Sequence, residues 1–278
     1  MKLHAINTGN FKLDGGAMFG VVPKSIWQKN YPADDNNMCN WAMRCLLIED
    51  GDKLILIDNG IGNKQSEKFF GHYFLNGDAS LERSLKKAGF SPDDVTDMFL
   101  SHLHFDHCGG GVVKKDENSF DPLFKNATYW SHSEQWNWAI NPNAREKASF
   151  LKENLMPMQE SGQLKFADDK ESGFNLFDFK IVKGHTESMM LPVIEYKNRK
   201  VVFCADLLPS TAHLPLPYVM AYDTRPLITL TEKAEFLNEA VKENYILFFE
   251  HDVKNQCADL SLTDKGIQIA QIFDVSEI

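Results

Sequence analysis

Cysteine is scarce in this sequence, and it occurs in none of the patterns that make it informative. The five thiols form an odd, scattered set without a Cys-x-x-Cys pair: Cys39, Cys45, Cys108, Cys204 and Cys257. A disulfide framework and a thiolate zinc site are therefore not expected, and unpaired thiols are typical of a reduced, cytoplasmic protein.

Positive charge is scarce as well. Lys and Arg number 29 against 39 Asp and Glu, which gives a net charge of −10. Binding to nucleic acid depends on neutralising phosphates, and binding to an anionic membrane depends on basic patches. No nucleic-acid or membrane partner is therefore expected.

Long apolar runs, repeats, low-complexity segments and Pro- or Ser-rich linkers are also missing. No run approaches the roughly 20 residues that span a bilayer, and residues 1–10 lack the apolar core of a signal peptide. The 278 residues are 43% hydrophobic and 24% charged, as in an ordinary globular protein. We therefore expect one domain over residues 1–278.

Hydrophobic patterning indicates an α/β protein. Residues 80–88 and 231–243 predict helices, with Thr231 as an N-cap, and residues 133–155 predict two helices separated at Asn141-Pro142. A hairpin turn is expected around Gly51. Because early strands form hairpins and later ones alternate with helices, mixed sheets with outer helices are favoured over a doubly wound fold. Nine short apolar runs predict strands: 2–8, 43–48, 53–58, 95–100, 127–131, 176–182, 189–195, 201–205 and 245–250.

The chain has nine histidines, and three of them lie between His102 and His107. If the strand at 95–100 continues in extended geometry, His102, His104 and Asp106 point to one side. His107 then requires the chain to turn, which the glycines after Cys108 permit. A lone histidine is more often a packed core residue, but three histidines and an aspartate in six residues favour a metal site. Imidazole and carboxylate without thiolate suit Zn, Mn, Fe or Co.

The motif His-x-His-x-Asp-His after an apolar strand resembles the signature of the metallo-β-lactamase-fold hydrolases. That resemblance implies an α/β, four-layer αββα sandwich of two mixed β-sheets with a two-metal centre at one edge. It also implies three further ligands at strand ends, and His185, Asp206 and His251 occupy such positions. Taken alone, His185 reads equally well as a loop residue. Asp206 also fits a turn former or a helix cap, and His251 also fits a surface pair with Asp252.

Carried over by position, the resemblance distributes the ligands between two metals. Asp58 matches the family aspartate that orients a ligand imidazole, although a turn aspartate is an equally good reading of it. The implied ligands are His102, His104 and His185 for one metal and Asp106, His107 and His251 for the other, with Asp206 bridging both.

Two flanking segments narrow the resemblance. Residues 13–27 and 212–223 are similar to the quorum-quenching lactonase branch, which includes methyl-parathion-hydrolase-type phosphotriesterases. Asp206 stands where true β-lactamases often carry Cys, which disfavours a lactamase. The well-studied lactonases carry a Tyr three residues after the bridging Asp, and this chain has Pro209 there. His213 and Tyr222 are the candidates to contact substrate in its place.

The resemblance implies a dinuclear-metal-dependent hydrolase that uses a bridging hydroxide to open a lactone or ester, with an N-acyl homoserine lactone as one candidate. Zinc is the favoured metal, with Mn, Co and Fe as alternatives, and Asp106 is expected to carry a proton to the leaving group. Phosphotriester hydrolysis is the first alternative, and a non-hydrolytic metal-binding or redox di-iron protein is the second. The apolar residues 18–27 read more readily as core than as a substrate pocket. In the resembled branch this region also lies at a dimer interface, so a homodimer is a further expectation.

Overall fold

The computed structural model describes residues 1–117 and 119–278. The chain divides into two compact units, of which the first comprises Met1–Asn10 and Met43–Leu176 and the second Phe11–Ala42 and Phe177–Ile278. The expectation of a single domain over residues 1–278 stays a prediction. Among the described helices, none combines the length and the apolar character that crossing a bilayer requires.

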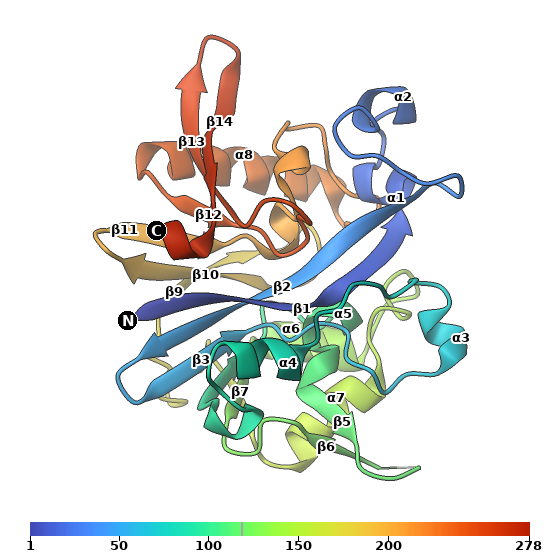
Figure 1. Cartoon of the computed structure of the whole chain (residues 1–278), viewed down its shortest axis with the longest axis vertical. Helices are drawn as coiled ribbons and strands as arrows, with labels where there is room; N and C mark the ends of the chain where they lie inside the picture. The colour runs from blue at the N-terminus through green and yellow to red at the C-terminus, as the bar shows by residue number, and fades with distance from the viewer. Residues whose placement is uncertain (118) are drawn as a thin grey trace. The chain divides into compact units, whose positions relative to one another are not determined.

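A mixed six-stranded sheet with the order β1-β2-β3-β4-β7-β8 has most of its residues in the first unit (Figure 1). Strands β2 and β3 form an antiparallel hairpin, whereas β3, β4, β7 and β8 run parallel. The strands are β1 (Lys2–Asp14), β2 (Met38–Asp50), β3 (Lys53–Ile57), β4 (Asp97–Phe99), β7 (Thr128–Ser131) and β8 (Leu164–Phe166), with a separate pair of β5 (Val112–Lys114) and β6 (Phe120–Pro122).

Three helices of the first unit contribute to its hydrophobic core. Leu85 of α4, Trp136 of α6 and Met158 of α7 belong to one hydrophobic core with residues of the strands. Ser80 caps α4, since its Oγ accepts a hydrogen bond from the backbone N–H of Arg83. The helical segments are α3 (Glu67–Phe70), α4 (Leu81–Lys87), η1 (Pro92–Asp94), α5 (Phe105–Cys108), η2 (Gly109–Gly111), α6 (Ser133–Ile140) and α7 (Lys152–Glu160).

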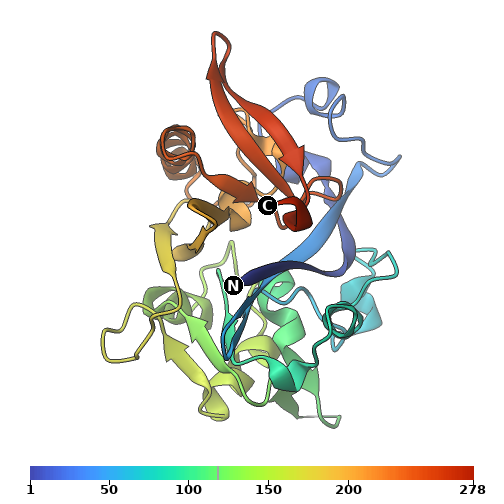
Figure 2. The ribbon, with the colours of Figure 1, turned by 60° about the vertical axis from the view of Figure 1, so that its left-hand side comes forward.

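The second unit contains another mixed six-stranded sheet, with the order β14-β13-β12-β11-β10-β9. Only β11 and β12 pair in parallel, and the hairpin β13–β14 forms one edge (Figure 2). Its elements are α1 (Gly15–Phe19), α2 (Lys24–Trp27), β9 (Asp178–Val182), β10 (Met189–Tyr196), β11 (Arg199–Phe203), η3 (Ala205–Leu207), η4 (Thr211–His213), α8 (Pro226–Lys242), β12 (Ile246–Phe248), β13 (Cys257–Thr263), β14 (Gly266–Phe273) and η5 (Val275–Glu277).

Aromatic stacking fixes the N-terminal segment within the second unit. The ring of Phe19 stacks between Trp27, with centroids 5.0 Å apart, and His213, with centroids 4.7 Å apart. Met18, Phe19 and Trp27 are buried, whereas Val21 is 91% exposed. The prediction that residues 18–27 form core rather than a substrate pocket therefore holds for Met18, Phe19 and Trp27.

Most sequence-based elements are confirmed. All nine predicted strands are present, as are the hairpin at Gly51 and the break between α6 and α7. The N-cap prediction for Thr231 is wrong, because α8 begins at Pro226 with Arg225 at the capping position. Proline suits the first helical turn, where its missing N–H is not needed. Strands β5, β6, β8, β13 and β14 were not predicted from the sequence.

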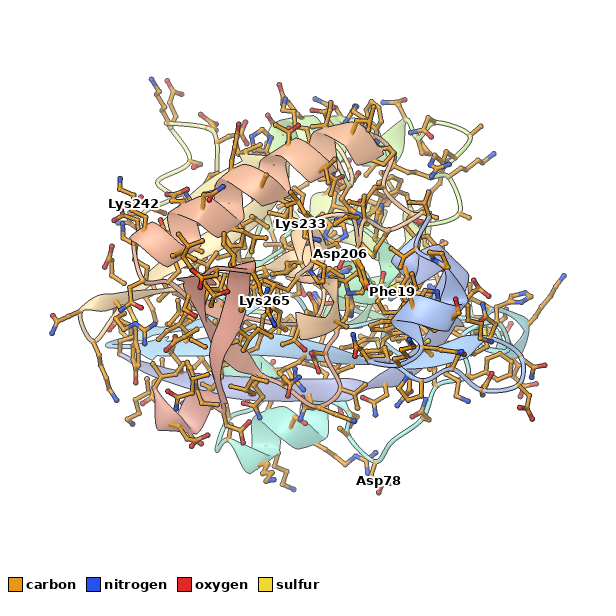
Figure 3. All side chains as sticks on the ribbon, turned by 90° about the horizontal axis from the view of Figure 1, so that it is seen from above. Phe19, Asp78, Asp206, Lys233, Lys242 and Lys265 are labelled. Atoms are coloured by element: carbon orange, nitrogen blue, oxygen red, sulfur yellow. The ribbon has the colours of Figure 1, made fainter. Side chains whose placement is uncertain are left out.

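A fully buried lysine ties α8 to the loop after η4. Lys233 points inward from α8, whereas Lys242 lies at its outer end (Figure 3). The Lys233 Nζ donates to the backbone carbonyls of Pro215 at 2.9 Å and Tyr218 at 3.0 Å. Burial lowers the pKa of Lys233 from 10.5 to about 7. A neutral amine has two N–H donors, and these match the two carbonyls.

Replacing Lys233 with Met should change how stability depends on pH. Between pH 7 and about 10 the unfolded lysine holds a proton that the folded amine has lost, so the contribution of Lys233 rises with pH. The free energy of unfolding of the wild type minus that of Lys233→Met should therefore increase with pH, by up to about 1.4 kcal/mol per pH unit. Urea unfolding at several pH values measures this increase. Lys242→Met, whose side chain is 81% exposed, is the matched control, and a wild-type–variant difference that is constant with pH would refute the assignment.

Candidate metal centre

The histidine-rich segment of the first unit changes from irregular chain to helix within the motif. Strand β4 ends at Phe99, and His104 is the N-cap of α5, so Asp106 and His107 lie on one helical turn. The expectation that extended geometry continues to Asp106 is therefore wrong. The predicted turn is present, but it begins at Phe105 rather than at His107.

Close backbone packing makes this turn possible. The segment after His107 lies against the residues that follow β3, with hydrogen bonds from Asn59 N to the His107 carbonyl at 2.9 Å and from Gly110 N to the Gly60 carbonyl at 2.7 Å. A Cβ atom at Gly110 would overlap the carbonyl oxygen of Asn59. Lys64 donates to the Gly109 carbonyl from the same side. Glycine is needed here because the two backbones touch.

Asp58 organises two of the histidines. Its Oδ2 accepts from the Nδ1 of His107 at 3.0 Å and from the hydroxyl of Ser101 at 2.5 Å, while Oδ1 accepts from the Ser101 backbone at 2.7 Å. The Nδ1 of His102 lies 3.1 Å from the Ser101 Oγ, whose own proton is given to Asp58. Both rings therefore carry their proton on Nδ1 and present Nε2 as the ligand atom. The predicted contact of Asp58 with a ligand imidazole is confirmed.

The ring of His104 is turned the other way, so that Nε2 rather than Nδ1 meets the orienting oxygen acceptor. Its Nδ1 lies 3.1 Å from the Nε2 of His102, while its Nε2 lies 3.3 Å from a carboxylate oxygen of Glu146. Glu146 is buried and also accepts from the indole of Trp138 at 2.6 Å and the amide of Asn143 at 2.7 Å. Glu146 is thus fixed in place, and His104 presents Nδ1 beside the Nε2 of His102.

The carboxylate of Asp106 faces the same side as the ring of His107, with 3.7 Å between Asp106 Oδ2 and His107 Nε2. The aromatic rings of Tyr73 and Phe105 pack next to this turn. Burial, together with the negative charge of Asp106, raises the pKa of Tyr73 to about 12. The Tyr73 phenol therefore stays protonated at neutral pH beside the carboxylate.

In the second unit, Asp206 lies between two histidines. Its Oδ2 is 3.1 Å from the Nε2 of His185, and its Oδ1 is 3.1 Å from the Nε2 of His251. Ala205, the residue before it, has φ 41. A left-handed conformation costs a non-glycine residue roughly 1–2 kcal/mol, and such strain is common next to functional side chains. One carboxylate thus serves two imidazoles with separate oxygens.

The other nitrogen of each of these two histidines is also occupied. His185 Nδ1 lies 2.8 Å from Asp223, and His251 Nδ1 lies 2.7 Å from the carbonyl oxygen of Ala42. Burial lowers the pKa of His185, but its pairing with Asp206 and Asp223 outweighs burial and raises that pKa to about 10. Both histidines of this unit therefore present Nε2 to Asp206.

The donor atoms within each unit are of the types that bind a divalent metal. All seven candidate ligands are buried, with at most 8% of any of them exposed. In each of the five histidines one ring nitrogen meets an oxygen acceptor, which leaves the other nitrogen as the ligand atom. Imidazole and carboxylate suit Zn, Mn, Co or Fe. Cys108 adds no thiolate, because burial raises the pKa of its thiol to about 12.

The two candidate substrate contacts lie in different surroundings. His213 is buried, with Nδ1 2.8 Å from the Ser210 hydroxyl and Nε2 2.9 Å from the Met18 carbonyl. Burial lowers the pKa of His213 to about 3, so the ring is neutral and donates from Nε2. Tyr222 is 39% exposed and immediately precedes Asp223. Roles for His213 and Tyr222 in substrate binding stay predictions.

Sequence reasoning missed three residues that orient the ligands. Ser101 precedes the motif but carries no signal that it links His102 to Asp58. Glu146 is 42 positions from His104, and Asp223 is 38 positions from His185. No local pattern predicts such long-range pairs. Asp223 lies within a segment that resembles the lactonase branch, which is the one signal that pointed towards it.

Comparison with known proteins agrees with this chemistry. The metallo-beta-lactamase superfamily model matches residues 44–251, and the chain belongs to this superfamily. It is a metal-dependent hydrolase. The predicted α/β class with two mixed sheets and the metallo-β-lactamase fold are confirmed.

Individual relatives share less than a third of their residues with this chain. The chain is 22% identical to an N-acyl homoserine lactonase of Bacillus cereus, over 92% of this chain and 94% of that protein. The structure of a probable metal-dependent hydrolase from Staphylococcus aureus has a TM-score of 0.88 at 29% identity, covering 98% of this chain and 96% of the other. AidC, a dizinc quorum-quenching lactonase in complex with a product, gives a TM-score of 0.79 at 25% identity, covering 98% and 95%.

Replacing the orienting carboxylates should weaken metal binding in different ways. Asp58→Asn disturbs both His102 and His107, whereas Glu146→Gln disturbs His104 alone. Loss of such a partner typically lowers metal affinity by about 10–100-fold, and Asp58→Asn should have the larger effect. Competition with a chromophoric chelator measures the affinity.

Asp78→Asn is the matched control, because Asp78 is exposed and lies at the periphery (Figure 3). Unchanged metal affinity in both orienting variants would contradict the roles given to Asp58 and Glu146.

Proposed function

We propose that the protein hydrolyses a small, neutral lactone or ester with two divalent metal ions, and that an N-acyl homoserine lactone is the first substrate to test. The observation that carries this proposal is the donor set itself. Five imidazoles have one nitrogen each committed to an orienting acceptor, and Asp206 offers its two oxygens to two separate histidines.

The proposed ligand sets are those that the resemblance to the superfamily implies. Asp206 is proposed to bridge the two ions, which is supported by the separate contacts of its two oxygens. The similarity to a dizinc lactonase supports zinc as the metal. We assign His102, His104 and His185 to one ion and Asp106, His107 and His251 to the other.

Divalent ions held by such residues would supply an acidified water as the nucleophile and polarise the carbonyl under attack. The chain's own residues then orient ligands and move a proton. Asp58, Glu146 and Asp223 hold the imidazoles in the required tautomers. Asp106 is the carboxylate proposed to carry a proton from the nucleophile to the leaving alkoxide.

The substrate class is supported by relatives and by charge. Lactonases recur among the similar proteins, and one similar structure is a lactonase with a product bound. The net charge of −10 makes a neutral lactone a better ligand than an anionic substrate. The absence of the lactonase-type Tyr, replaced here by Pro209, keeps phosphotriester hydrolysis as the competing activity to be measured.

Three substrates rank these activities. Metal-defined protein should hydrolyse N-hexanoyl homoserine lactone faster than an aryl ester, and both faster than paraoxon. Activity should disappear on chelation and return with Zn, Mn or Co. A faster rate on paraoxon would favour the phosphotriesterase, and a di-iron centre that cycles with a reductant without hydrolysis would contradict the proposal.

Asp106→Asn tests the proton-transfer role. Asn keeps the shape of the side chain but cannot carry the proton, and general acid–base contributions are about 10²–10⁴-fold. We expect kcat to fall by at least about 100-fold on that scale, with the loss greatest for substrates with poor leaving groups. Metal content is measured alongside turnover. If Asp106→Asn kept full metal occupancy and full turnover, the proton-transfer role of Asp106 would be refuted.

A further inference from the structure

A pocket of about 440 Å³ lies within the second unit. It is lined by residues of the N-terminal segment, of η4 and the residues after it, and of β14. None of its lining residues is among the seven candidate metal ligands. Its volume falls in the range of small-molecule binding sites, roughly 300–1,000 Å³.

About half of the residues that line the pocket are apolar. Tyr31, Pro32, Leu214, Pro215 and Ile269 contribute rings and branched side chains. Tyr31 is held rigidly, because its ring stacks on Trp41 with centroids 4.1 Å apart and its hydroxyl donates to the Asn40 carbonyl at 2.7 Å. A preformed apolar wall of this kind suits an alkyl or aryl group.

The acidic group in the lining is fully committed to the protein. Asp252 is buried, and its Oδ2 accepts from the backbone and the hydroxyl of Thr211 at 3.0 and 2.5 Å. Its Oδ1 accepts from the backbone N–H groups of Lys254 and Asn255, both at 2.9 Å. This carboxylate therefore fixes the loop and is not available to a ligand.

Lys254 places a positive charge at this pocket. Lys254 lines the pocket and is exposed, and within residues 1–117 and 119–278 its ammonium group forms no ion pair. That is notable in a chain with ten more acidic than basic residues, 39 against 29. The pocket thus combines an apolar wall with one available positive charge.

A second cavity lies next to the first. It measures about 370 Å³ and shares Leu214, Pro215 and Gln268 with the first. It continues beside Leu237 of α8 and Ile267 of β14. The two cavities therefore share part of one wall.

We propose that this pocket binds an amphipathic monocarboxylate, with its alkyl or aryl body against Tyr31, Leu214 and Ile269 and its carboxylate at Lys254. The site is separate from the proposed hydrolytic centre and does not depend on it. It lies close along the chain, however, because Asp252 follows His251 and the His251 backbone donates to the Pro209 carbonyl at 3.1 Å. A ligand here contacts the loop that carries a candidate metal ligand.

Octanoate is the probe, and octanamide is its neutral counterpart. Titration calorimetry on the metal-loaded protein should show that octanoate binds more tightly than octanamide. Lys254→Gln should weaken octanoate binding by about fivefold, as expected for loss of a partly exposed ion pair, and leave octanamide binding unchanged. Lys242→Gln on α8 is the matched control and should leave both unchanged.

A second variant tests the pocket by filling it. Ala212 lines the cavity, and Ala212→Trp should abolish binding of both probes while leaving the circular dichroism spectrum unchanged. If that variant fails to fold, Lys254→Gln decides alone. Equal octanoate affinity in the wild type and Lys254→Gln, or no binding at millimolar octanoate, would overturn the proposal. So would binding that survives both variants and disappears on chelation, which would assign octanoate to the metal ions.

Discussion

The hydrogen bond between a histidine and its oxygen acceptor is the interaction on which this centre depends. Each candidate imidazole ligand has one nitrogen engaged in this way, by Asp58, Glu146, Asp223, the Ser101 hydroxyl or the Ala42 carbonyl. Such a bond fixes the tautomer, the ring orientation and the basicity of the ligand atom together. Buried imidazoles without these acceptors would be free to rotate or to protonate on the wrong nitrogen.

Backbone strain accompanies these bonds at the ends of strands. Asp58, directly after β3, has φ 57, and Ala205, directly before Asp206, has φ 41. Neither residue is glycine, so each conformation costs roughly 1–2 kcal/mol. Buried packing offsets that cost, because both residues are fully inaccessible to solvent. The positions of the Asp58 and Asp206 carboxylates are therefore set by the fold around them.

Local pattern was enough for nine of the strands and for the ligand motif, since both depend on neighbouring residues. It was insufficient where the deciding contact is distant: the partner of His104 is Glu146, and the partner of His185 is Asp223. It also failed at α5, where the chain turns into a helix at Phe105, earlier than alternation suggests. The one-domain organisation, the cytoplasmic location and the homodimer stay predictions.

The contact between the glycines after His107 and the chain after β3 bears on the engineering of such centres. The six-residue motif resembles a portable cassette, but its shape is imposed by Asn59, by Lys64 and by Glu146 in a later segment. Transplanting the motif alone would move the ligands without the surfaces that shape them. To reproduce this centre in another protein, the contacting segments would have to be transferred together with the motif.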